Sequence, residues 1–176
     1  MTINPIANEV FELISAMGIG YRYISHPPVD TIEDCKQYAD ALGAIMPKNI
    51  FLAPRNESCF YLLLTRPEAK YRTADISKQL GVSRLSFGSS ERLYEYLQTL
   101  PGAISPMGLL YDEDRKVSLA IDSALRDAEF LAFHPCINTM SLAMSGEDFY
   151  GRFLPALGVT PKFVEIHDFK DITIRS

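Results

Sequence analysis

The residues of this chain that could do chemistry lie in three short stretches: Lys48-Asn49, the loop from Gly102 to Gly108, and His134. His134 has the side chain whose unperturbed pKa lies nearest neutrality, so it could serve as an acid, a base or a hydrogen-bond donor. Gly102 would let the backbone approach a substrate closely, and Pro106 would stiffen the loop. Main-chain groups held in this way could bind a polar substrate and a water molecule.

Each stretch also has an ordinary structural interpretation. A lysine at the start of a strand, such as Lys48, commonly protects a sheet edge, and glycine and proline punctuate loops everywhere. Ser105 could be a nucleophile, but no G-x-S-x-G turn surrounds it and no Asp and His are evident as its partners. The residues alone therefore leave both interpretations open, and covalent catalysis through Ser105 is the less favoured one.

Hydrophobic periodicity predicts the elements that must position these stretches. Lys48 begins an apolar run to Ala53, which a polar turn joins to a second run over residues 59–64, so the two form a hairpin. Helices are predicted at 5–17, 31–42, 73–80 with Thr73 as its cap, from Ser89 or Ser90, and at 145–157, with further strands at 21–24, 117–121, 130–133, 139–144 and 163–166. Hairpins mixed with helices predict an α+β fold with one mixed, curved β-sheet and flanking helices.

The length and composition fit one soluble domain. The 176 residues, 47% hydrophobic and 22% charged, predict a domain over residues 1–166 with a polar tail at 167–176. Because no apolar run approaches a membrane span or a signal peptide, we expect a cytoplasmic protein that does not bind a membrane.

Charge and cysteine content narrow the possible partners. A net charge of −5 argues against non-specific binding to DNA or RNA. The basic residues Lys70, Arg72, Lys78, Arg84 and Arg92 could still form a local basic face, although their spacing favours dispersed solubilising charges. Cys35, Cys59 and Cys136 are widely spaced and lack metal-ligand spacing, so we expect neither a metal nor another cofactor.

Taken in chain order, Lys48-Asn49, Gly102-x-x-x-Pro106 and Phe133-His134-Pro135 resemble the YbaK and prolyl-tRNA-synthetase-associated editing domains. The resemblance is closest to the free-standing prolyl-tRNA deacylases and extends from the helix at Pro5 to the strand at Phe163. It implies that activity depends on Lys48, that the loop covers the aminoacyl group, and that His134 lies beside the pocket. The substrate-binding residues that it implies are Asn49, Gly102, Ala103, Ile104, Ser105, Pro106, Gly108 and His134. Met46 and Met107 flank this site and could line it, although methionine is more often a core residue.

The function that this resemblance implies is trans-editing, the hydrolysis of mischarged Ala-tRNA(Pro). A synthetase pocket built for proline rejects the smaller alanine weakly, so a second, smaller pocket must remove it. The implied partners are the 3′ acceptor end of mischarged tRNA and a prolyl-tRNA synthetase, and a ribose hydroxyl of the terminal adenosine would assist the reaction. Two alternatives stay open: hydrolysis of another small mischarged residue, such as Cys-tRNA(Pro), and a module that binds aminoacyl-tRNA or a synthetase without hydrolysis.

Overall fold

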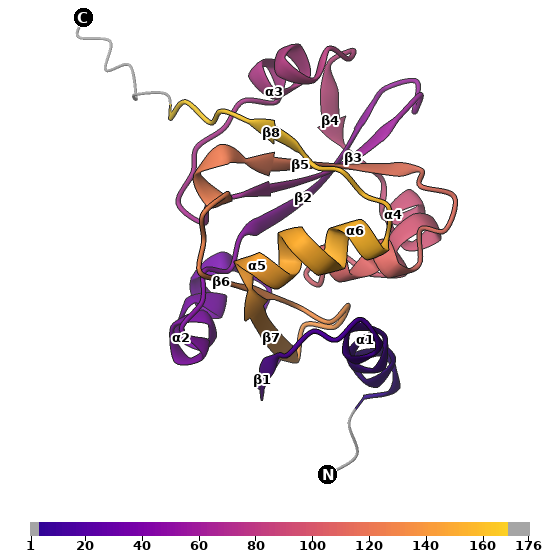
Figure 1. Ribbon diagram of the computed structural model, residues 1–176. Helices are drawn as coiled ribbons and strands as arrows, with labels where there is room; N and C mark the ends of the chain where they lie inside the picture. The colour runs from indigo at the N-terminus through magenta and orange to yellow at the C-terminus, as the bar shows by residue number, and fades with distance from the viewer. Residues whose placement is uncertain (1–3, 169–176) are drawn as a thin grey trace, which may run out of the picture.

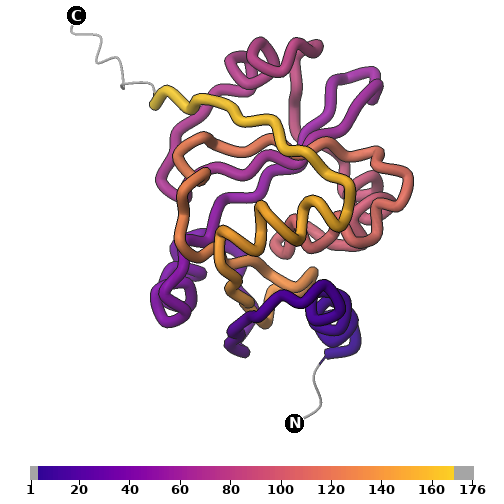
Figure 2. The backbone as a smooth tube through the Cα atoms, in the orientation of Figure 1, coloured from indigo at the N-terminus to yellow at the C-terminus, as the bar shows by residue number. Residues whose placement is uncertain are grey.

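The computed structural model describes residues 4–168, which form helices around two β-sheets (Figure 1). Figure 2 traces the chain from the N-terminal helix at one end of the molecule to the C-terminal strand at the other. The strands are β1 (Arg22–Ser25), β2 (Lys48–Pro54), β3 (Phe60–Thr65), β4 (Leu85–Phe87), β5 (Val117–Asp122), β6 (Phe130–Phe133), β7 (Met140–Ser145) and β8 (Lys162–Val164). The helices are α1 (Pro5–Ala16), α2 (Ile32–Leu42), α3 (Thr73–Leu80), α4 (Ser90–Leu97), the 3-10 turns η1 (Pro106–Leu110) and η2 (Ser123–Leu125), and the consecutive segments α5 (Gly146–Asp148), η3 (Phe149–Phe153) and α6 (Leu154–Ala156).

The larger sheet has the strand order β4-β2-β3-β5-β8. β2 pairs antiparallel with both β3 and β4, whereas β5 pairs parallel with both β3 and β8. The predicted hairpin is therefore the centre of this sheet, with Lys48 opposite Thr65 at one end.

The side chains of successive residues in β2 pack into two different hydrophobic cores. Phe51 and Ala53 belong to the main core, which also includes residues of α1, α4 and the 149–154 helix, while Ile50 and Leu52 belong to a second core beneath α3. Alternation along a strand produces this division, because adjacent side chains point to opposite faces of the sheet. Burial on both faces explains why the strand reads as a continuous apolar run.

The smaller sheet is antiparallel, with the order β1-β7-β6, and it supports α2. His26, just after β1, is buried and holds this region together. Its Nδ1 donates to the Pro27 carbonyl at 2.8 Å, its Nε2 accepts from the Ser141 hydroxyl at 2.8 Å, and its ring stacks on Tyr38. A structural role accounts for all of these contacts.

The α+β class is confirmed, and the strands fall into two sheets where the sequence led us to expect one. The pattern of apolar runs cannot show which strands pair, and β4 was too short to be predicted. The cap of α2 is confirmed, since Thr31 Oγ1 accepts from the Asp34 amide at 3.1 Å. The cap assigned to Thr73 is wrong: Thr73 is the first residue of α3, and Arg72 precedes it at the N-cap position, where no side chain caps the helix.

Gly108 packs so tightly against α4 that a methyl group at this position would collide with the backbone. A Cβ there would lie 2.7 Å from the Leu97 carbonyl oxygen, whereas a Cβ on Gly151 would meet nothing within 4 Å. We expect Gly108→Ala to lower the free energy of unfolding by ~1–3 kcal/mol through overpacking. Chemical denaturation measures this, with Gly151→Ala as the control; equal stability of the two variants would contradict the packing described here.

Candidate functional site

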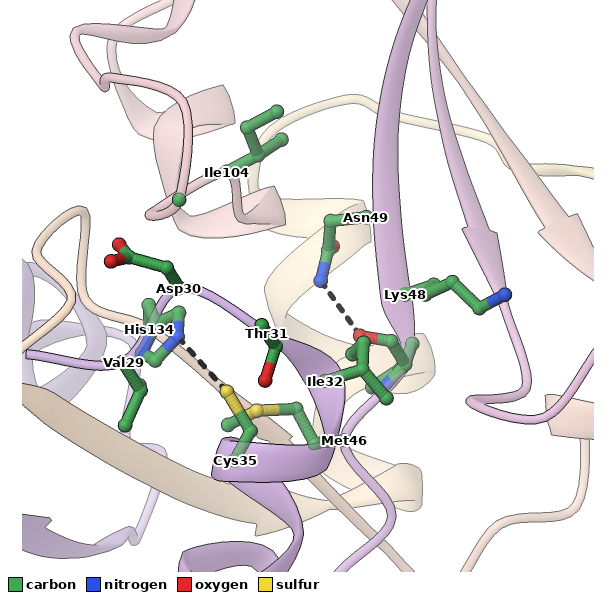
Figure 3. Close-up of a pocket in the computed structure, with 12 residues that line it drawn as sticks. Val29, Asp30, Thr31, Ile32, Cys35, Met46, Lys48, Asn49, Ile104 and His134 are labelled. Carbon is green, nitrogen blue, oxygen red and sulfur yellow. Dashed lines mark hydrogen bonds between the residues drawn. The ribbon is translucent and has the colours of Figure 1, made fainter.

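A pocket of about 170 Å³ lies where several distant parts of the chain meet. Its walls come from the segment between β1 and α2, the start of α2, the start of β2, the loop before η1, and the residue after β6 (Figure 3). Of the residues predicted for the site, six line it: Met46, Lys48, Asn49, Gly102, Ile104 and His134. The fold therefore brings together the three stretches that the sequence analysis singled out.

Lys48 and Asn49 face opposite sides of the sheet. The Lys48 ammonium turns away from the other pocket residues in Figure 3, donating to the Ala69 carbonyl at 2.8 Å and lying 5.9 Å from the centre of the Tyr71 ring. The Asn49 side chain lies on the side of the strand that faces the other pocket residues, and its amide nitrogen donates to the Pro47 carbonyl at 3.0 Å. Its Oδ1 is buried and accepts no hydrogen bond from the residues that the structure describes. An acceptor placed in this way is suited to a donor on a ligand.

His134 is a neutral imidazole at the pocket wall. Burial lowers its pKa from the ordinary value of 6.5. Nδ1 lies 2.8 Å from the Met140 carbonyl oxygen, which can only accept, so Nδ1 carries the proton and Nε2 carries the lone pair, which accepts from the Cys35 thiol. That nitrogen lies 3.7 Å from the sulfur of Cys35, a thiol whose pKa is raised by burial and by Asp34 and which therefore keeps its proton.

Gly102 allows the loop to approach the opposite wall. Its φ of +90° lies in the left-handed region, and a Cβ added there would come within 3.3 Å of the Asp30 carboxylate. Asp30 is held by the Asn138 side-chain amide at 3.2 Å. Glycine is therefore required both by the backbone conformation and by the narrow gap between the two walls.

The other predicted loop residues do not line this pocket. Ser105 is fully buried, and its hydroxyl caps η1 by accepting from the Met107 amide at 3.1 Å. The remaining four are buried in the body of the domain: Ala103, Pro106, Met107 and Gly108. Proline and glycine thus shape the short helix behind the loop, and Ser105 is a capping residue whose hydroxyl does not reach the pocket.

The pocket wall formed by residues 29–35 was not predicted from the sequence. Val29, Asp30, Thr31, Ile32 and Cys35 all line the pocket, and Pro47 lies between Met46 and Lys48. The sequence features of this segment, the prolines before it and the helix cap at Thr31, indicated only where a helix begins. Neither feature indicates that the start of α2 faces a ligand, because the neighbour of a helix end is set by tertiary packing.

The basic residues named above are spread over several elements, and one of them, Arg92, forms ion pairs with acidic side chains. Arg92 pairs with Glu57 at 2.7 Å and with Glu95 at 2.6 Å on the surface. Within residues 4–168, no group of three or more His, Cys, Asp or Glu side chains is arranged to hold a metal ion. Over the same residues, none of the helices has the length and apolar character that crossing a bilayer requires.

The fold and the pocket define an α+β domain with a small pocket between the start of a central strand and a glycine loop. Residues 26–150 match the aminoacyl-tRNA editing domain, so the chain belongs to that family. It is therefore a hydrolase that acts on the ester bond between an amino acid and tRNA.

Known proteins similar to this chain support the assignment. It is 31% identical over 157 residues to the prolyl-tRNA editing protein ProX of Acetoanaerobium sticklandii, covering 89% of this chain and 95% of that protein. It is 30% identical to the prolyl-tRNA synthetase associated domain-containing protein 1 of Mus musculus, covering 92% and 96% of the two chains. A crystal structure described as a proposed trans-editing enzyme for prolyl tRNA synthetase shares the fold, with a TM-score of 0.71, 15% identity, and coverage of 96% and 100%.

The buried state of His134 predicts a dependence of stability on pH. Because the pKa is lowered in the folded protein, the unfolded chain binds a proton at pH values where the folded chain does not. The free energy of unfolding should therefore fall as the pH drops below about 6.5. We expect His134→Asn, which keeps a donor for the Met140 carbonyl, to reduce the dependence of the melting temperature on pH between pH 7.5 and 5. His167→Asn, at an exposed histidine, should keep the wild-type slope, and equal slopes in all three proteins would contradict this account.

Proposed function

We propose that this protein is a trans-editing deacylase that hydrolyses mischarged Ala-tRNA(Pro). The observation that carries the proposal is the convergence of Lys48, Asn49, Gly102, Ile104 and His134 on one small pocket in a chain of the editing family. The names of its relatives, which refer to prolyl-tRNA editing and to prolyl-tRNA synthetase, support the choice of tRNA.

The size of the pocket supports a small amino acid. A volume of about 170 Å³ is that of roughly six water molecules at ~30 Å³ each. The ring of proline adds two carbons to the atoms that an alanyl ester must place there. Met46, Ile104 and Cys35 bound the space with apolar groups, so a larger side chain would have to displace a packed wall.

The two polar acceptors in the pocket suit the amino end of the substrate. Asn49 Oδ1 has no partner among the described residues, and the Asp30 carboxylate lies across the gap beside Gly102. An ammonium group on the α-carbon of the amino acid would satisfy both. The Nε2 lone pair of the neutral His134 faces the Cys35 thiol at 3.7 Å, and a hydroxyl group or a water molecule at the ester would replace this weak donor.

Lys48 would supply positive charge where negative charge develops on the ester or on the adjacent phosphate. Its ammonium now binds the Ala69 carbonyl, a single partly exposed hydrogen bond worth only ~1–3 kcal/mol. The side chain has a long flexible stem, so an anionic substrate could draw the ammonium around the first residue of β2 to the pocket. The role in catalysis thus requires a change of side-chain rotamer, without movement of the strand.

The substrate assignment is tested with a panel of Ala-, Cys-, Ser- and Pro-tRNA(Pro). We expect the release of alanine to be fastest and the release of proline to be slowest, because the larger ring would press against the apolar wall of the pocket. Initial rates of amino acid release, measured at equal tRNA concentrations, give the order. Faster release of cysteine would transfer the assignment to Cys-tRNA(Pro), and tight binding without any release would leave only a tRNA-binding role.

The role of Lys48 is tested with two substitutions that separate its charge from its packing. Lys48→Met keeps the apolar stem, and Lys48→Ala removes it. If the ammonium stabilises developing charge, both should lower kcat for Ala-tRNA(Pro) by about 10²–10³-fold while the fold is retained. Lys78→Met, at an exposed position on α3, is the control; normal turnover by Lys48→Met would show that the ammonium is not used.

The alternative of a serine esterase is tested at Ser105. Its buried hydroxyl caps η1, so Ser105→Ala should reduce stability by ~1 kcal/mol and leave the rate of alanine release close to wild type. Deacylation rate and thermal melting are measured on the same preparation. Loss of turnover in a folded Ser105→Ala protein would favour covalent catalysis over the mechanism proposed above.

A further inference from the structure

A second hollow, which we call the β2 notch, adjoins the pocket at the point where the edge strand β4 ends. It has a volume of about 220 Å³ and is lined by Asn49, Ile50, Phe51, Phe87, Gly88, Ser90, Leu93, Pro101 and Ile104. Asn49 and Ile104 line both hollows, so these two side chains form the shared wall between them. A molecule whose reactive end occupied the pocket would therefore place its adjoining part in the notch.

The most exposed of the large hydrophobic side chains in residues 4–168 stands at this notch. Phe87 is 75% exposed, although it follows the buried Leu85 in the same short strand. Because the Phe87 ring is exposed to solvent at the edge of the notch, one face of the ring is open to a planar ligand. The packing of the sheet does not require this ring, since the inner residues of β2 are already covered without it.

The chemistry of the notch suits a nucleobase. The residues that line it are uncharged, and they include three hydrophobic side chains with low exposure, Ile50, Phe51 and Leu93. By contrast, the other hollow that adjoins the pocket is lined by the carboxylates of Glu33 and Glu68 and by the ion pair of Lys36 with Asp40, so its net charge is negative and would repel an RNA strand. Unpaired bases bind proteins by stacking on exposed aromatic rings in uncharged grooves.

We propose that the β2 notch is the binding subsite for the 3′-terminal nucleobase of the substrate, which stacks on Phe87. The inference rests on the proposed function, because the ester in the pocket and the base are joined through a single ribose. Asn49 and Ile104 would then lie beside that ribose, between the amino acid on one side and the base on the other. Stacking accepts any base, so Phe87 contributes to affinity and to the placement of the ester without reading the tRNA sequence.

The experiment compares two substrates and four proteins. The substrates are Ala-tRNA(Pro) with its natural 3′-terminal adenosine and the same tRNA with a terminal ribose that lacks a base. The proteins are wild type, Phe87→Ala, Phe87→Trp and Tyr94→Ala, the last a control at a residue of α4 that is 53% exposed and lies outside the notch. Steady-state kcat and KM are measured for each pair.

For the natural substrate, we expect Phe87→Ala to raise KM about tenfold with little change in kcat, and Phe87→Trp to restore it. For the substrate without the base, wild type and Phe87→Ala should share the same raised KM. Tyr94→Ala should behave as wild type throughout. A Phe87→Ala effect that is equal on both substrates, or absent from both, would overturn the proposal.

A binding measurement separates this inference from the proposed function. The oligonucleotide 5′-ACCA-3′ and its counterpart without the last base are titrated against wild type and Phe87→Ala, and NMR shifts of the aromatic rings are followed. Base-dependent shifts that require Phe87 would support the subsite even if wild type released no alanine from Ala-tRNA(Pro). Equal shifts with both oligonucleotides would refute the subsite even if the deacylase activity were present.

Discussion

The alternation of side chains along β2 is the constraint on which the site depends. Ile50 and Leu52 fill one core while Phe51 fills the other, so the strand is buried on both faces and its register cannot slip by one residue without exposing each set. Because the register is fixed, Asn49 must turn toward the pocket and Lys48 must start on the opposite face. The free energy of the whole sheet thus determines the orientation of two polar side chains at its end.

The pocket itself is built by elements that are remote in sequence and have little else in common. α2 presents its first turn, the glycine loop presents backbone, and the smaller sheet presents His134 through its bond to the Met140 carbonyl. Each wall is held by packing or by hydrogen bonds made outside the pocket, so a substrate meets groups that are already oriented. Preorganisation of this kind is what the hydrolysis of an already activated ester chiefly requires.

Much of the local structure was predictable because its causes are local. The α2 cap, the hairpin and the buried strands follow from Thr31 with Asp34, from the polar turn at 54–58, and from uninterrupted apolar runs. The division into two sheets, the wall at 29–35 and the direction of the Lys48 ammonium were not predicted, since pairing and tertiary packing decide them. Side chains alternate between the two faces of any strand, so the prediction of β2 was already enough to place Lys48 and Asn49 on opposite faces.

The loop that accepts the Lys48 hydrogen bond is fastened from the far end of the chain. Asp168 accepts from the Arg66 guanidinium at 2.7 Å and from the Lys70 amide at 2.9 Å, and Arg66 also contacts the buried Asp122. The carbonyl of Ala69 lies between these two anchored residues. Cleavage or fusion close to Asp168 would therefore remove hydrogen bonds that hold residues 66–70 in place. The Ala69 carbonyl that binds the Lys48 ammonium would then lose its fixed position.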